Sequence, residues 1–226
     1  MDNFMPQKLD ILLTGVGGQG VVLAGDVLGD LGISAGYDVK KSDTLGMAQR
    51  GGSVVAHVRM GSDVASPLIP KGEADLLLSF EKLETIRWAD HIRAGAVVLY
   101  NDQKIPPLSV SRGEATYPSD EQIVLALSSR TTDIFAVPGD VLTLGLGNPK
   151  VLNVIMLGAL SMFLPFSPDA WIKTITSRVP EKVVEINSEA FTIGRKEMRR
   201  QMMEMAIQDE REYLEGVSEH DDSCEC

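Results

Sequence analysis

A run of glycines between two hydrophobic stretches, near the start of the chain, is the feature that most restricts its fold. Residues 11–29 read ILLTGVGGQGVVLAGDVLG. The apolar residues 9–14 predict a short buried strand, and apolar residues at helical spacing predict a helix within residues 18–35. Because glycine has no side chain to obstruct a tight turn, the strand can pass directly into a helix that packs against it. This unit predicts an α/β domain.

The remainder of the chain repeats the alternation of strand and helix patterns. Apolar or β-branched runs predict further strands at 37–41, 53–61, 75–80, 95–101 and 133–139. Helical patterns are found at 81–88, 150–164, 168–178 and 181–214. The alternation predicts a Rossmann-like, mostly parallel sheet flanked by helices, with a helical extension over residues 196–214. An acidic disordered tail is expected over residues 215–226.

The charge of the chain is concentrated at its C-terminal end. The formal net charge is −11, and residues 209–226 hold eight acidic side chains and one arginine, which leaves −4 for the body. The sequence shows no lysine- or arginine-rich face, so nucleic acid is not expected as a partner.

Met198, Met202 and Met205 share one helical face, as core or subunit-interface residues do.

Cysteine content and hydrophobic segments limit which cellular compartment and which cofactors are expected for this chain. The two cysteines, Cys224 and Cys226, lie at the end of the sequence, so no disulfide forms within the body, as expected of a cytoplasmic protein. An iron–sulfur cluster generally takes four cysteine ligands, and none is expected on this chain alone. No signal peptide is visible, and the apolar stretch 151–166 predicts a buried helix rather than a membrane span.

The glycine loop itself, which consists of Gly15, Gly17, Gly18, Gln19 and Gly20, supports two interpretations. Its G-x-G-x-x-G spacing and the following helix N-terminus suit an anion such as a phosphate. The same glycines also suit close packing of a strand against a helix. An NAD site further expects an acidic residue at the end of the second strand. Asp38 is expected at the start of that strand and Asp43 in the loop after it, so neither is well placed.

A second candidate segment is centred on Arg50, Gly51 and Gly52. The planar guanidinium of Arg50 could hold a phosphate or carboxylate, or pair with a nearby carboxylate to fix the loop. Glu81 and Asn101 follow or end predicted strands, where ligands bind in open α/β sheets. A glutamate at that point is equally expected to begin a helix.

Catalytic motifs are absent from the sequence. The histidines His57, His91 and His220 are scattered, and there is no H-E-x-x-H, Walker lysine or G-x-S-x-G. No catalytic residue and no metal ligand is therefore predicted. From its residues alone, the chain is interpreted as a binding or scaffolding α/β domain.

Five segments, taken in order, resemble one family. They are GVGGQG (15–20), GMAQRGGSVVAHVR (46–59), SPLIPKGEADLLLSFE (66–81), GNPKVLNVIMLGAL (147–160) and RVPEKVVEINSEAF (178–191). Together they are similar to the gamma-type domain of the 2-oxoacid:ferredoxin oxidoreductases, over residues 8–195. The segment GMAQRGGS resembles the beta subunits of the indolepyruvate class more than the gamma subunits of the pyruvate or 2-oxoglutarate classes.

The resemblance implies oxidation of an aryl 2-oxoacid with CoA and ferredoxin to acyl-CoA, CO2 and reduced ferredoxin. It implies that thiamine diphosphate, Mg and the [4Fe–4S] clusters belong to a large alpha subunit, and that this chain completes the complex and is inactive alone. The glycine loop and Arg50 would then hold CoA phosphates or contact the large subunit. The tail after about Met198 exceeds the resemblance. A free-standing nucleotide-binding protein, such as a small NAD or flavin reductase, remains the alternative.

Overall fold

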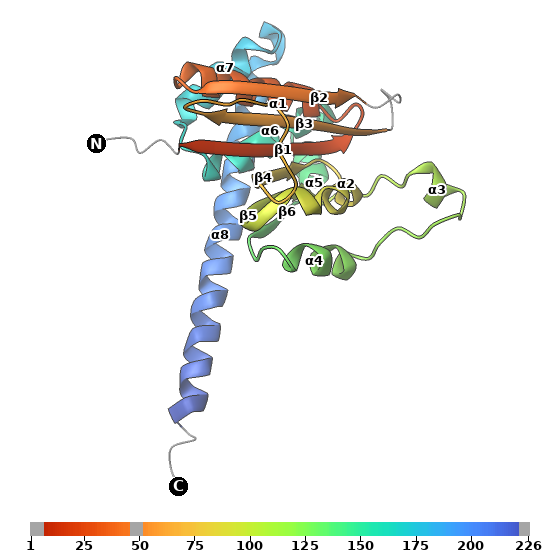
Figure 1. Ribbon diagram of the computed structural model, residues 1–226, viewed down its shortest axis with the longest axis vertical. Coiled ribbons are helices and arrows are strands. Elements are labelled where there is room, and N and C mark those ends of the chain that lie inside the picture. The colour runs from red at the N-terminus through yellow and green to blue at the C-terminus, as the bar shows by residue number, and fades with distance from the viewer. Residues whose placement is uncertain (1–6, 46–51, 222–226) are drawn as a thin grey trace.

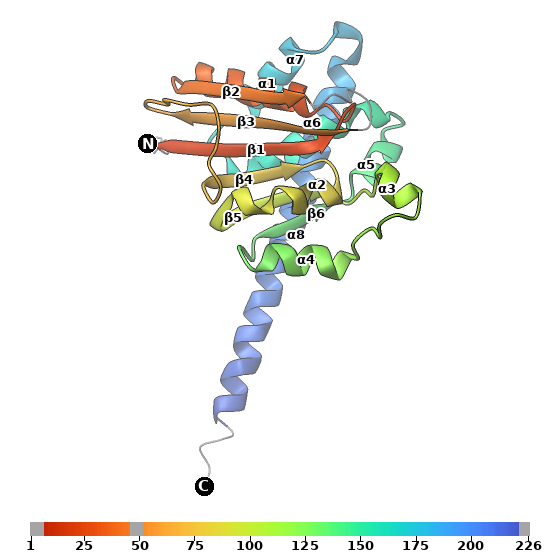
Figure 2. The same cartoon turned by 45° about the vertical axis from the view of Figure 1, so that its right-hand side comes forward.

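The chain forms a single mixed sheet with helices on both faces. The computed structural model describes residues 7–45 and 52–221. Six strands pair in the order β2-β3-β1-β4-β5-β6 (Figures 1 and 2). Their bounds are β1 Lys8–Val16, β2 Asp38–Leu45, β3 Ser53–Gly61, β4 Ala74–Ser79, β5 Ile92–Asn101 and β6 Ile134–Val137.

The helices follow in the order that the alternating pattern predicts, with three additions. Their bounds are α1 Val21–Ser34, α2 Lys82–Arg87, α3 Leu108–Ser111, α4 Asp120–Ser128, α5 Gly139–Gly145, α6 Leu152–Leu160, α7 Pro168–Ser177 and α8 Val184–Asp221. Short 3-10 turns lie at η1 Ala89–His91, η2 Pro149–Val151, η3 Ser161–Phe163 and η4 Glu181–Val183. Helices α3, α4 and α5 were not expected from the sequence.

The prediction of a mostly parallel sheet is confirmed, with one strand as the exception. Strand β1 pairs in parallel with β4, β4 with β5, and β5 with β6. Strand β3 lies between β1 and β2 and is antiparallel to both. Parallel strands need a crossover of a dozen or more residues. Only residues 46–52 join β2 to β3, so these two strands form an antiparallel pair.

Alternate residues of the strands divide the core between the two faces of the sheet. Ile11 and Leu13 of β1 belong to the larger cluster, which α1, α6, α7 and α8 cover. Leu12 belongs to a smaller cluster on the opposite face, closed by α4 and by the segment that contains Ile69. This division follows from the two-residue repeat of a strand. All nine residues of α6 are buried, as expected for the apolar stretch 151–166.

Helices α6 and α8 approach so closely that only glycine fits at their crossing. A Cβ atom built on Gly194 would lie 1.9 Å from the carbonyl oxygen of Ile155, and one on Gly158 would lie 2.2 Å from that of Phe191. Next to this crossing, Met198 is fully buried, and Met202 and Met205 pack against the same cluster. The methionine face predicted from the sequence is therefore part of the core.

Helix α8 then leaves the body and extends away from it (Figures 1 and 2). It continues to Asp221, past the end predicted near Leu214. A single Gly216 costs a helix only about 1 kcal/mol relative to alanine, which is too little to end it. The boundaries predicted at residues 195 and 214 stay predictions. Within the described part of the chain, no helix combines the length and hydrophobicity needed to cross a bilayer.

Candidate functional site

The glycine loop lies at the carboxyl edge of the sheet, between β1 and α1. The backbone N–H of Val16 donates to Oε1 of Gln19 at 2.7 Å, and the N–H of Gln19 donates to the carbonyl of Val16 at 3.1 Å. Gly18 and Gly20 have φ angles of 105° and 85°. Side chains are strained in this left-handed region, so glycine is required for the turn. Gly20 caps α1 without any side-chain hydrogen bond.

Gln19 joins the loop to the ends of the neighbouring strands. Its Nε2 donates to the carbonyl of Phe80 at 2.8 Å, just after β4, and to Oε1 of Gln103 at 3.1 Å, just after β5. Nδ2 of Asn101 donates to the same Phe80 carbonyl at 3.2 Å, and the N–H of Gly139 donates to Oδ1 of Asn101 at 3.1 Å. These hydrogen bonds of side-chain amides hold the ends of β1, β4, β5 and β6 together at one edge of the sheet. Asn101 lies where the sequence predicts, with its amide in this network.

Glu81 follows β4, as predicted, and caps α2 through its buried carboxylate. The side chain is 1% exposed. Its Oε2 accepts from the N–H of Glu84 at 3.0 Å, and its Oε1 accepts from the N–H of Ile105 at 2.9 Å and from the hydroxyl of Tyr117. Burial and the bond to Glu81 raise the pKa of Tyr117. The carboxylate therefore has protein donors on both oxygens, and a ligand-binding role for it stays a prediction.

The second predicted segment lies only partly within the described residues. Arg50 and Gly51 fall outside them. Gly52 is described, and its carbonyl accepts from the N–H of Gly17 at 2.8 Å. The end of this segment therefore meets the glycine loop, although 34 residues of sequence separate Gly17 from Gly52.

A cleft of about 310 Å³ opens beside the glycine loop. Gly18, Gln19 and Gly20 form one wall, and residues that the sequence analysis did not select form the others: Gln103, Ile105, Asp140, Thr143, Pro149, Lys150, Leu152 and Asn153. Within the described ranges, Lys150 forms no ion pair, so its ammonium group is available to an anion.

Asn153 lies against the loop closely enough to restrict it. A Cβ atom on Gly20 would lie 2.8 Å from Nδ2 of Asn153. The segment before α6 therefore contributes to the same cleft as the glycine loop. The only sequence signal for this was GNPK before an apolar helix, which marks a helix start and not a binding site.

The position of β3 removes the usual place for a ribose-binding acid. In a dinucleotide fold, the strand after the glycine-loop helix lies beside β1 and carries that acid at its carboxyl end. Here β3 occupies the place beside β1, and β2 lies one strand further out. Asp38 begins β2, as expected. Asp43 lies within β2 rather than in the loop after it, and its Oδ2 accepts from Lys41 at 2.8 Å. The antiparallel pairing with β3 continues as far as Leu45, so it includes Asp43 in β2.

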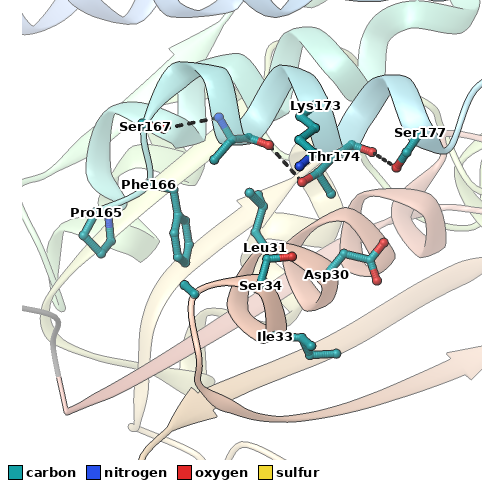
Figure 3. A pocket seen from close by; sticks show the side chains of 12 residues that line it. Asp30, Leu31, Ile33, Ser34, Pro165, Phe166, Ser167, Lys173, Thr174 and Ser177 are labelled. Carbon is teal, nitrogen blue, oxygen red and sulfur yellow. Dashed lines mark hydrogen bonds between the residues drawn. The ribbon is translucent and has the colours of Figure 1, made fainter.

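A larger cavity, of about 610 Å³, lies between the end of α1 and α7, away from the carboxyl edge (Figure 3). Phe166 and Leu31 contribute apolar walls. The hydroxyl of Ser167 accepts from a backbone N–H of α7, and the hydroxyls of Thr174 and Ser177 donate to carbonyls of the same helix. These hydroxyls already have partners, so the cleft at the glycine loop is the better candidate for a polar ligand. In the ranges 7–45 and 52–221, no group of three or more His, Cys, Asp or Glu side chains could hold a metal ion.

The mixed sheet and the glycine loop at its carboxyl edge define a Rossmann-like α/β domain. The sequence profile described as pyruvate ferredoxin/flavodoxin oxidoreductase matches residues 10–197. The chain belongs to this family, which confirms the resemblance identified from the five segments. Its relatives are subunits of 2-oxoacid oxidoreductase complexes, as predicted.

Individual relatives agree with this assignment. The chain is 39% identical over 191 residues to indolepyruvate oxidoreductase subunit IorB of Pyrococcus horikoshii, covering 83% of this chain and 95% of that subunit. The gamma subunit of a keto/oxoacid ferredoxin oxidoreductase from Geobacter sulfurreducens has a TM-score of 0.67 at 23% identity, covering 86% of this chain and 98% of that one. The 2-oxoglutarate:ferredoxin oxidoreductase of Magnetococcus marinus, solved with 2-oxoglutarate, coenzyme A and succinyl-CoA, has a TM-score of 0.66 at 21% identity, covering 86% of this chain and 32% of that one.

Proposed function

We propose that this chain is the gamma-type subunit of a complex that oxidises an aryl 2-oxoacid of the indolepyruvate class. The observation that carries the proposal is the 39% identity to the Pyrococcus horikoshii subunit over nearly its whole length. Identity to the 2-oxoglutarate synthase subunit KorC of Methanocaldococcus jannaschii is lower, 28% over 199 residues. In the proposed reaction the 2-oxoacid loses CO2, its acyl group passes to the thiol of CoA, and two electrons pass to ferredoxin.

The proposed distribution of cofactors between the subunits is the one that the family resemblance implies, and the cysteine content of this chain agrees with it. Two cysteines, both at the extreme C-terminus, are too few for a [4Fe–4S] cluster. As the family resemblance implies, the clusters, thiamine diphosphate and Mg are assigned to the large alpha subunit, and this chain is proposed to be inactive without it. Ferredoxin meets the complex rather than this chain alone, and the complex works in the cytoplasm.

The glycine loop is the proposed contact for the phosphates of CoA. Three observations support this. The N-terminus of α1 has no side-chain cap, so its first N–H groups and its dipole suit an anion. The Cα–H of Gly18 faces open space, with no atom within 4 Å of a built Cβ, so a phosphate can approach the backbone. Lys150 adds a positive charge to the same cleft. The alternative role of the loop is contact with the large subunit.

The first experiment is anaerobic co-expression with the adjacent large-subunit gene. Size exclusion and viologen reduction, dependent on indolepyruvate, CoA and thiamine diphosphate, are then measured. The proposal predicts a stable complex that is active only when both chains are present. A chain that stays separate from the large subunit and binds NAD or a flavin tightly would instead support the free-standing alternative.

The phosphate role is tested within that complex by Gly18→Leu, with Gly36→Leu as the matched control. Both glycines have positive φ angles, of 105° and 90°, and neither has an atom within 4 Å of a built Cβ. Both changes therefore introduce similar backbone strain, of about 1–2 kcal/mol. Gly36 follows the far end of α1, so only Gly18→Leu is expected to raise the KM for CoA, by about tenfold, with assembly intact. An unchanged KM would exclude the phosphate role, and loss of the large subunit would assign the loop to subunit contact.

A further inference from the structure

The outer part of α8 has no counterpart in the matched family region. The family profile ends at residue 197, and the alignment to the Pyrococcus horikoshii subunit uses 95% of that subunit but only 83% of this chain. Helix α8 continues to Asp221. Among the residues of α8 whose side chains are described, Met205 is the last that packs against the core. Residues 206–221 therefore extend about 24 Å beyond it, at 1.5 Å per residue.

This projecting segment carries an apolar face that the body does not cover. Met203, Ile207 and Tyr213 are 60%, 49% and 71% exposed. At 100° per residue, these three side chains and Ala206 fall within one third of the helix circumference. The core-facing residues Met198, Met202 and Met205 lie on the adjoining arc of the helix, with Met202 only about 20° from Tyr213. The exposed face therefore borders the core-facing one, but the sheet does not cover it.

The local interactions of α8 do not account for this face. Arg200 pairs with Glu197 and Glu204, at 2.6 Å and 2.7 Å, which supports the helix along its polar side. A short helix without tertiary contacts is marginally stable in water. Large apolar side chains gathered on one side of a projecting helix are typical of helices that insert into a groove on another protein.

The charge of the segment indicates what kind of groove fits. Residues 206–221 contain six acidic side chains and one arginine. Pairing with the same helix of a second copy would bring two acidic segments together, which like-charge repulsion opposes. A groove with an apolar floor and a rim of lysine and arginine side chains complements both the face and the charge.

We infer that residues 203–213 of α8 dock into an apolar, basic-rimmed groove on the large subunit of the complex. This inference rests on the proposed function, because the partner is the large subunit named there. The docking attaches the C-terminal helix of this chain to the large subunit at a distance from the glycine-loop edge. It is an addition to whatever contact the body of the domain makes.

The test is the affinity between the purified chain and its large subunit, measured for Met203→Glu/Ile207→Glu and for Arg211→Glu. Both variants change the net charge by −2, and both sites are exposed, so the fold of the body is unaffected. Arg211 lies about a quarter of a turn away from the centre of the apolar face. The double variant is expected to weaken binding by about tenfold or more, because charges then enter the apolar groove. Arg211→Glu is expected to leave the affinity unchanged or to increase it, and added salt is expected to weaken the wild-type complex.

Each other outcome has a defined meaning. If the wild-type chain forms an active complex and the double variant binds equally well, the docking of α8 is refuted and the proposed function stands. If the isolated chain is dimeric and the double variant makes it monomeric, the face belongs to a second copy and the inference is wrong. If the wild-type chain does not bind the large subunit at all, both the inference and the proposed function fail.

Discussion

The crossing of α6 and α8 makes a quantitative prediction for Gly194→Ala. The added Cβ would lie 1.9 Å from the carbonyl oxygen of Ile155. Heavy atoms in contact are about 3.5 Å apart, so the two helix backbones must separate by roughly 1.5 Å. Neither helix can move this far without losing contacts elsewhere, because all residues of α6 are buried. Overpacking of a tight core costs about 3 kcal/mol or more at such a site.

The intrinsic helix propensity of alanine offsets part of that cost, by about 1 kcal/mol. The net loss in the free energy of unfolding is therefore about 2 kcal/mol, which for a chain of this length lowers Tm by about 4–8 °C. Urea titration followed by circular dichroism, together with a thermal melt, measures both quantities.

The matched control is Gly29→Ala, in the middle of α1. No atom lies within 4 Å of a Cβ built on Gly29. Here only the propensity gain and the smaller entropy of the unfolded chain remain, so stability is expected to rise by about 0.5–1 kcal/mol. If Gly194→Ala proves as stable as the wild type, or if Gly29→Ala loses as much, the close approach of the helices is not what fixes glycine at this crossing.

Substitutions of Asp10, Lys8 and Glu84 test how burial affects charged side chains. Asp10 is fully buried and accepts from Nε and Nη2 of Arg59, both at 2.9 Å, so Asp10→Asn is expected to cost about 3–5 kcal/mol in a urea titration. Lys8→Met, which removes a half-exposed partner of the same carboxylate, is expected to cost less than about 1 kcal/mol, and equal losses would refute the role of burial. Burial raises the pKa of Glu84, whose Oε2 accepts from Ser53 at 2.5 Å. The folded state therefore favours the protonated form, and stability falls as pH rises through the unfolded pKa towards the raised folded one. Glu84→Gln is expected to gain stability relative to the wild type from pH 4 to pH 7, and a difference in Tm that does not vary with pH would contradict this.

The sequence predicted the elements whose patterns are strong. The glycine loop and β1 were found from the glycine spacing and the largely apolar residues before it, and β3 was found from its β-branched residues. Helix α4 was missed, although the sequence contains its signal: Ser119 and Gln122 form a capping box, with the Ser119 hydroxyl accepting from the Gln122 N–H at 3.2 Å. Helix α5 was missed because it is short and buries only Gly139 and Thr143.

Only the glycine-loop wall of the candidate cleft was predicted from the sequence. The glycine loop, Glu81 and Asn101 follow strands, and the carboxyl ends of parallel strands meet at one edge, so their proximity could be expected. Lys150 and Asn153 reach the same cleft because α6 packs beside α1, and the nearest ends of these helices, Ser34 and Leu152, are 118 residues apart in the sequence. No local pattern records a contact of this kind.

The direction of β3 could have been deduced from the short link between β2 and β3. The apolar pattern alone ends the second strand at Lys41, which places Asp43 in a loop. An antiparallel hairpin extends β2 as far as its partner, which brings Asp43 into the strand.

The outer position of β2 has a consequence for how this chain assembles. An edge strand of eight residues offers unpaired backbone groups that could recruit a strand from a neighbouring molecule. Asp38, Lys40, Lys41 and Asp43 line this strand, and a strand added there would have to lie beside these charges. These charges therefore disfavour extension of the sheet by a partner strand at β2.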